Sequence, residues 1–240
     1  MQMQMQCNPD KTKRPPKQNP SLMNALIKII TSNRMWAVLL VAAAGCGTPS
    51  GYKQADKTGE SINTLRNDVA AIKTAVDASM KALDGLEASA STDPRKAYET
   101  YAKSVDKVES AHRKATKQAE EMRERGQAYF QQWEAQLGSV KNEEIRKLAQ
   151  ERRAKLQETF GNIKTVAQDA NQAFPPYLSN LKDLRTALGT DLTVQGIDAA
   201  KPIIQKTKTS GIELQKHLDS LVAELNSVVA AITAHKAQAK

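Results

Sequence analysis

The sequence predicts an all-α protein, an elongated antiparallel helical bundle or folded-back coiled coil of about four long helices. Aromatic residues make up only 4% of the 240 residues, and the chain has 11 glycines. That composition is typical of long helices with thin, alanine-rich seams. Apolar residues recur at spacings of three and four over four long segments, which indicates one buried stripe on each helix. The segments are joined by short connections that favour antiparallel neighbours. Helices of about 40 residues at 1.5 Å per residue would form a rod about 60 Å long.

The first two helices are expected over residues 52–90 and 94–138. Asp93 can cap the second helix, with Pro94 at its first position, where the missing N–H costs nothing. Gly138 is expected to end that helix. The two apolar stripes share the spacing of three and four and comprise Ile62, Leu65, Val69, Ile72, Val76, Met80 and Leu83, then Tyr98, Tyr101, Val105, Val108, His112, Ala115, Ala119, Met122, Phe130, Trp133 and Leu137.

The third helix is expected over residues 142–189, with Asn142 as its N-cap and Gly189 as its end. Pro175 and Pro176 should kink or break it, because each proline removes a backbone donor and clashes with the preceding turn. A hinge and a fixed bend are equally open interpretations of this pair. Its stripe comprises Ile145, Leu148, Leu156, Phe160, Ile163, Val166, Phe174, Leu181, Leu184 and Leu188.

The fourth helix is expected over residues 193–237, beginning at Asp191 or Thr193 and carrying Pro202 near its start. Its stripe comprises Ile197, Ile204, Leu214, Leu218, Leu221, Leu225, Val228 and Ile232. Residues 52–238 are therefore expected to form one helical domain.

An uncharged apolar run covers residues 35–45 and follows the basic residues Lys28 and Arg34. A membrane-spanning helix needs about 20 apolar residues, so this run is too short to span, but it fits a signal-peptide core. A spanning segment that reaches back to Ile27 is the alternative, and both charges interrupt it. Residues 1–45 are therefore interpreted as a disordered start plus a signal peptide.

The run ends in Ala-Ala-Gly-Cys at residues 43–46, which resembles the lipobox of bacterial lipoproteins. Ala43 stands where leucine is usual. The resemblance implies a diacylglyceryl thioether on Cys46 and cleavage after Gly45; the alternative is an ordinary cysteine after a short buried helix. Residues 46–51 would form a short tether. Gly47, in place of aspartate, resembles the pattern sorted to the outer membrane, which implies its periplasmic face.

Residues 1–22 contain a Met-Gln repeat and a Lys/Pro-rich stretch, a composition typical of disorder. Translation could start at Met1 or at Met23, and a start at Met23 gives a signal peptide of normal length. In that case Cys7 would be absent and Cys46 would carry lipid, so no disulfide and no catalytic thiol would remain.

Three segments share a pattern with a known family: Trp133-Glu134-x-x-Leu137, the Arg/Gln/Glu-patterned stretch 144–163, and Pro176-Tyr177-Leu178-x-x-Leu181-x-Asp183. By these segments the chain resembles domain-of-unknown-function family 2959, uncharacterised bacterial α-helical lipoprotein-like proteins. The likeness covers most of residues 52–235 and is strongest over 129–197. The chain departs from the family pattern at Leu184 and Arg185 and over residues 189–191. The resemblance implies a helical, lipoprotein-like fold and no known activity.

No phosphate-binding loop, dinucleotide motif, nucleophile elbow or zinc-protease motif is present. His112 falls on an apolar stripe, where a seam histidine satisfied by a neighbour is a better interpretation than a metal ligand or proton relay. Tyr129, Phe130 and Trp133 could stack on bases or dip into lipid, but their spacing favours an aromatic plug near a bundle end. We expect no catalytic residue, cofactor, metal or small-molecule substrate, and no enzymatic activity.

The net charge of +9 is unevenly placed, since residues 1–45 hold six Lys or Arg and one Asp. The remaining charge is interspersed as on solvated helix faces, which argues against nucleic acid as a partner. The leading hypothesis is a membrane-anchored envelope lipoprotein acting as a structural, scaffolding or partner-binding rod. Its partners would be the membrane and another protein or a second copy. The alternatives are a membrane-remodelling or pore-forming amphipathic protein and a cytoplasmic coiled coil that binds nucleic acid.

Overall fold

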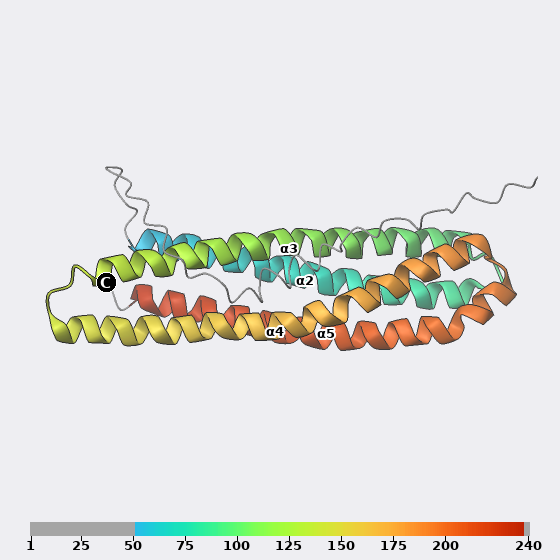
Figure 1. The fold of residues 1–240 in the computed structure, drawn as a ribbon. Coiled ribbons are helices and arrows are strands. Elements are labelled where there is room, and N and C mark those ends of the chain that lie inside the picture. The colour runs from blue at the N-terminus through green and yellow to red at the C-terminus, as the bar shows by residue number, and fades with distance from the viewer. Residues whose placement is uncertain (1–50, 238–240) are drawn as a thin grey trace, which may run out of the picture.

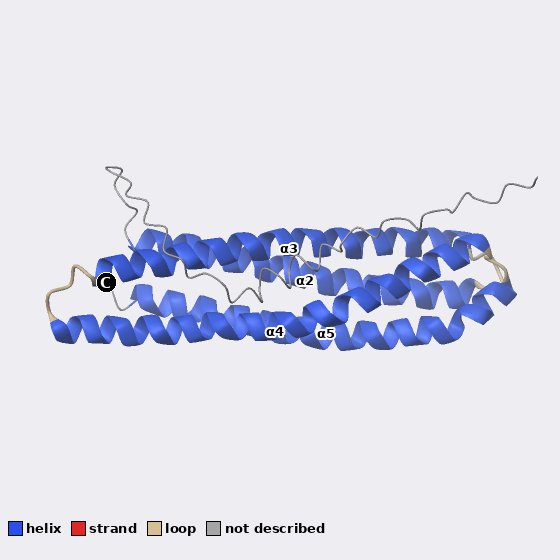
Figure 2. Cartoon of the chain, in the orientation of Figure 1, coloured by secondary structure: helices blue, strands red, loops and turns tan. Residues whose placement is uncertain are grey.

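The computed structural model describes residues 51–237, which form four long helices and no strand. They are α2 (Gly51–Ser89), α3 (Arg95–Leu137), α4 (Glu143–Thr190) and α5 (Val194–Ala237) (Figure 1). Figure 2 shows only short loops between them. The predicted all-α fold is confirmed, and the observed helix bounds differ from the expected ranges by one residue at most.

The helices run up and down in an elongated bundle (Figure 1). α2 packs against α3 and α5, and α4 packs against α5 and α3; of these four interfaces, the one between α3 and α4 is the least extensive. We call the end that holds the start of α2 and the loop 138–142 the Gly51 end, and the opposite end, with the loops 90–94 and 191–193, the Asp191 end. The 43 residues of α3 correspond to a rod about 65 Å long.

Side-chain oxygens accept backbone hydrogen bonds at the start of three helices. Asn142 is the N-cap of α4 and accepts from the Ile145 amide at 3.0 Å. In α3 the N-cap is Pro94, not Asp93 as expected, and the Asp93 carboxylate, one residue earlier, accepts from the Arg95 amide at 3.1 Å. For α5 the cap is Thr193, whose hydroxyl accepts from the Gly196 amide at 3.1 Å. These oxygens satisfy donors that have no partner in the first turn of a helix.

Gly189 does not end α4, contrary to the expectation, because the helix continues through Thr190 to an extended Asp191. A β-carbon at Gly189 would overlap the hydroxyl of Tyr98 on α3. That hydroxyl donates to the Arg185 carbonyl at 2.9 Å. The close approach of Tyr98 therefore explains the glycine. The chain leaves the helix two residues later, at Asp191.

Pro175 and Pro176 lie inside α4 without breaking it. Each lacks an N–H, so two carbonyls of the preceding turn lose their usual donors. The neighbouring Phe174 and Tyr177 are buried, and this packing holds the proline-containing turn in the core. Figure 1 shows α4 changing direction in its orange part, toward α3.

The core follows the predicted stripes along most of the bundle, with two exceptions. Ile145 and Leu148 are 57% and 62% exposed, although their spacing had predicted burial. Between residues 143 and 169 of α4, only Leu156 and Ile163 are buried. In the first half of α4, therefore, no other helix covers the part of the apolar stripe that contains Ile145 and Leu148.

Candidate functional site

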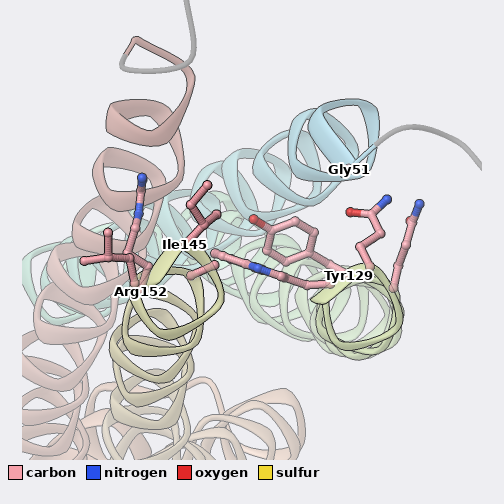
Figure 3. Close-up of a pocket in the computed structure, with 9 residues that line it drawn as sticks. Gly51, Tyr129, Ile145 and Arg152 are labelled. Atoms are coloured by element: carbon pink, nitrogen blue, oxygen red, sulfur yellow. The ribbon is translucent and has the colours of Figure 1, made fainter. Parts of the chain in front are cut away.

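A hollow of about 490 Å³ opens at the Gly51 end, between the last turns of α3 and the first turns of α4 (Figure 3). Its main lining side chains are Tyr129, Trp133, Ile145, Leu148, Ala149 and Arg152. Gly51, the first residue of the bundle, borders the same hollow. In Figure 3 Tyr129 extends from α3 toward Ile145 on α4. The hollow thus lies where the bundle emerges from the N-terminal segment.

Four aromatic rings cluster beside this hollow, and two of them, Tyr129 and Trp133, line it. Tyr129 lies with its ring centre 5.4 Å from that of Phe130 and 5.5 Å from that of Trp133. Phe130 meets Phe160 of α4 edge to face at 5.3 Å. Gly126 gives Phe160 room, since a β-carbon there would come within 3.0 Å of its ring. The rings therefore join α3 to α4 where few other apolar contacts do so.

The predicted aromatic plug divides into two environments. Tyr129 and Phe130 are buried, whereas Trp133 is half-buried and faces the hollow. Burial raises the pKa of Tyr129 to about 12, against an opposing effect of the Arg152 charge. The phenol is therefore neutral at physiological pH and is suited to packing, not to proton transfer.

The rim of the hollow combines exposed apolar and basic side chains. Ile145, Leu148, Arg152 and Lys155 are exposed, and their spacing of three and four places them on one face of α4. Residues 141–155 contain six basic and three acidic residues. Chemically, this rim can receive apolar groups flanked by anions.

Two ion pairs lie close to this rim. Arg153 pairs with Glu134 of α3 at 3.0 Å, and Arg146 pairs with Glu143 at 2.9 Å. The first of these pairs links α4 to α3, and both neutralise basic charge near the hollow. Arg152 and Lys155 lie on the exposed face of α4.

No cluster of three or more His, Cys, Asp or Glu residues suited to a metal ion occurs among residues 51–237. Within the same residues, no helix combines the length and apolarity that crossing a membrane requires. We therefore take the hollow at the Gly51 end as the candidate site.

His112 lies in the middle of the bundle, stacked on Phe174 with ring centres 3.8 Å apart and planes 13° apart. Its Nε2 is buried and has no hydrogen-bond partner among the described residues. The imidazole ring packs in the seam as expected. The expectation that a neighbour satisfies its hydrogen bonds is wrong for Nε2. Burial lowers the pKa of His112 to about 4, although Glu109 acts in the opposite direction.

Two buried tyrosines join the C-terminal third of α4 to the neighbouring helices α2 and α3 by hydrogen bonds. The Tyr177 hydroxyl lies 2.6 Å from the Ser79 hydroxyl and donates to the Val76 carbonyl of α2 at 3.3 Å. Burial raises the pKa of Tyr177 to about 12, while the Ser79 hydrogen bond lowers it. The Tyr101 hydroxyl donates to the Leu181 carbonyl at 2.6 Å. These neutral phenols hold helices together across the core.

The family model described as "Protein of unknown function (DUF2959)" matches residues 50–234. The chain belongs to this family. The match spans nearly all of the four helices, so the resemblance inferred from the Trp133 and Pro176 segments is confirmed. No curated protein and no solved structure matches the chain. The description of the family names no activity.

The proposed lipid attachment residue Cys46 and the cleavage position after Gly45 lie outside the described residues. The aromatic residues and the proline pair belong to different regions, since the former lie at the Gly51 end and the latter deeper in α4. Sequence reasoning missed Tyr177 as a core residue, although it follows directly on the proline pair. It also missed the exposed rim, for which the sequence offered only the basic residues around Ile145 and Leu148.

Proposed function

We propose that this protein is a lipid-anchored lipoprotein of the bacterial envelope, whose helical bundle acts as a structural or partner-binding rod. The observation that carries the proposal is the position of Gly51, where the folded bundle begins five residues after Cys46 in the sequence. Five extended residues span at most about 18 Å. An anchor on Cys46 would therefore hold the Gly51 end next to the bilayer.

The geometry of the rod supports a role at a distance from the membrane. The bundle is about 65 Å long by the 1.5 Å rise of its helices, and its Asp191 end lies opposite the Gly51 end. With the anchor in the periplasmic face of the outer membrane, the Asp191 end would stand far into the periplasm. The partner would be another envelope protein or a second copy of this chain. The narrow buried stripes favour this role over pore formation, which needs a wide apolar face.

Metabolic labelling with palmitate tests the anchor. The full chain should become labelled and sediment with membranes, whereas Cys46→Ala should remain unlabelled and keep residues 1–45. The matched control is Cys7→Ala, which should label like the parent chain. An unlabelled parent chain, recovered intact in the cytoplasm, would overturn the anchor.

In-cell crosslinking tests the rod's partner. A photoreactive residue at Thr190 on the Asp191 end should give a discrete adduct with one protein or with a second copy. The same group at exposed Lys103, on the side of α3, serves as the comparison. A monodisperse monomer without adducts from either position would contradict a scaffolding role.

A further inference from the structure

The apolar residues at the Gly51 end differ from other exposed apolar residues because they surround a hollow. Ile145 and Leu148 are more than half exposed and lie one turn apart on α4. Trp133 faces the same hollow from α3. Two aliphatic side chains and a tryptophan, grouped on one end of a rod, form a compact apolar tip.

We propose that this tip is a bilayer-contact surface, in which Ile145, Leu148 and Trp133 enter the headgroup boundary while Arg152 and Lys155 contact anionic phospholipid headgroups. The inference rests on the proposed anchor for its orientation. It adds that the rod contacts the membrane through its own side chains and is not held there by the lipid anchor alone.

The short distance in sequence between Cys46 and Gly51 favours a bilayer as the surface that the tip contacts. Gly51 borders the hollow, and residues 46–50 reach at most about 18 Å when fully extended. A lipid chain on Cys46 therefore keeps the tip within reach of the headgroup layer at all times. No comparable constraint would bring another protein to this end.

Residue types and charge also favour a bilayer. Tryptophan is enriched at membrane interfaces, and aliphatic residues beside basic ones are typical of surfaces that lie on anionic lipid. The face of α4 that carries Ile145 and Leu148 continues into Arg152 and Lys155, so the apolar tip has a basic border.

A second copy of the chain fits this surface less well. A stable protein interface buries about 800 Å² on each partner, from about 20–30 residues. The tip offers three apolar side chains. A symmetric pairing through it would also bring two basic rims together, which costs free energy by charge repulsion.

Fluorescence quenching by brominated lipid tests the proposal. The chain has two tryptophans, so Trp36→Phe leaves Trp133 as the single reporter. The full chain with this change and Cys46→Ala is added to vesicles of phosphatidylglycerol and brominated phosphatidylcholine. We expect Trp133 to be quenched. Ile145→Ser with Leu148→Ser should weaken vesicle binding through the tip about tenfold, in line with the loss of two partly buried aliphatic side chains.

The matched control is Ile203→Ser with Ile212→Ser, since both isoleucines are about half exposed on α5, at 45% and 53%. The apolar run 35–45 is present in both double variants, so its own membrane affinity cancels in the comparison. Circular dichroism should show equal helix content in both. Equal quenching of Trp133 in the two variants, or none in the parent, would overturn the proposal.

A second pair of variants tests the headgroup contact. Arg152→Gln with Lys155→Gln should remove the dependence of quenching on phosphatidylglycerol, whereas Lys103→Gln with Lys107→Gln on α3 should preserve it. A parent chain that forms dimers without vesicles, and loses them in the Ile145/Leu148 variant, would assign the tip to a protein interface and overturn the proposal.

The anchor and the tip can fail separately. Palmitate labelling without any difference between the two serine variants would remove the tip and leave the anchor. Absence of labelling, together with a clear difference between those variants, would remove the anchor and leave a membrane-binding tip.

Discussion

Acid should destabilise the bundle through His112, which lies against Phe174 at a ring-centre distance of 3.8 Å. The imidazole is half-buried, and its Nε2 is buried without a hydrogen-bond partner among the described residues. Protonation would place a charge there, and burial accordingly lowers the pKa of His112 to about 4, with Glu109 opposing the shift. The folded state therefore binds this proton less readily than the unfolded chain does.

The sign and size of the effect follow from the two pKa values. The ordinary value of 6.5 applies to the unfolded chain, and about 4 applies to the folded chain. One pKa unit corresponds to 1.36 kcal/mol, so the difference amounts to about 3 kcal/mol. The free energy of unfolding should be unaffected by this group above pH 6.5. It should fall as the pH drops from 6.5 and reach the full loss below about pH 4. Such a loss is a sizeable part of the 5–15 kcal/mol typical of a domain.

Urea unfolding, followed by circular dichroism between pH 7 and pH 4, measures this loss in the wild type and in His112→Phe. The carboxylates that titrate in this range are common to both chains and cancel in the difference. The phenylalanine variant should lose about 3 kcal/mol less than the wild type over this range. If the imidazole charge is responsible, the free energy of unfolding of His112→Gln should depend on pH in the same way as that of His112→Phe. A wild-type-to-variant difference that stays constant from pH 7 to pH 4 would refute the reasoning.

Two further predictions concern the tyrosines that hold α4. Tyr177→Phe, which removes the hydroxyl contact with Ser79 (2.6 Å), should lower the free energy of unfolding by about 1 kcal/mol, and Tyr177→Ala should lower it by about 3–5 kcal/mol through the cavity it leaves; equal effects in thermal or urea unfolding would contradict this assignment. Gly189→Ala should destabilise the protein because a β-carbon there overlaps the Tyr98 hydroxyl, and Tyr98→Phe should restore part of the loss; additive effects of the two changes in a double-mutant cycle would count against the proposed contact.

The helices and their starts could be predicted from local signals. Spacings of three and four identify a helix wherever one face is buried, and Asn142 and Thr193 begin helices because their side chains reach free amides within three residues. Exposure could not be predicted in the same way. Ile145 and Leu148 continue the stripe of α4 in perfect register, but burial depends on whether another helix lies opposite, which spacing along one helix does not report.

The parts that sequence reasoning missed depend on contacts between distant helices. Gly189 resembles a helix end, and only the approach of Tyr98 from α3 explains it inside the helix. Tyr177 follows two prolines, which suggested a break, yet its hydroxyl bonds to α2 and keeps that turn in the core. For Cys46 the structure adds nothing to the sequence, because this residue lies outside the described residues and its role is argued from sequence alone.

The distribution of contacts along α4 links the fold to the proposed orientation. Toward the Asp191 end, Lys182 pairs with Glu109 at 2.9 Å and Arg185 with Asp106 at 2.7 Å, beside the two tyrosine hydroxyls that bond to α4 carbonyls. Toward the Gly51 end, the contacts between α4 and α3 include the ring contact of Phe160 with Phe130 and the Arg153–Glu134 ion pair. A rod that used its Asp191 end for membrane contact would leave its loosest interface in the periplasm and its apolar tip in water. With the Gly51 end on the bilayer, the headgroup layer would cover the tip, and the Asp191 end would remain free to meet a partner.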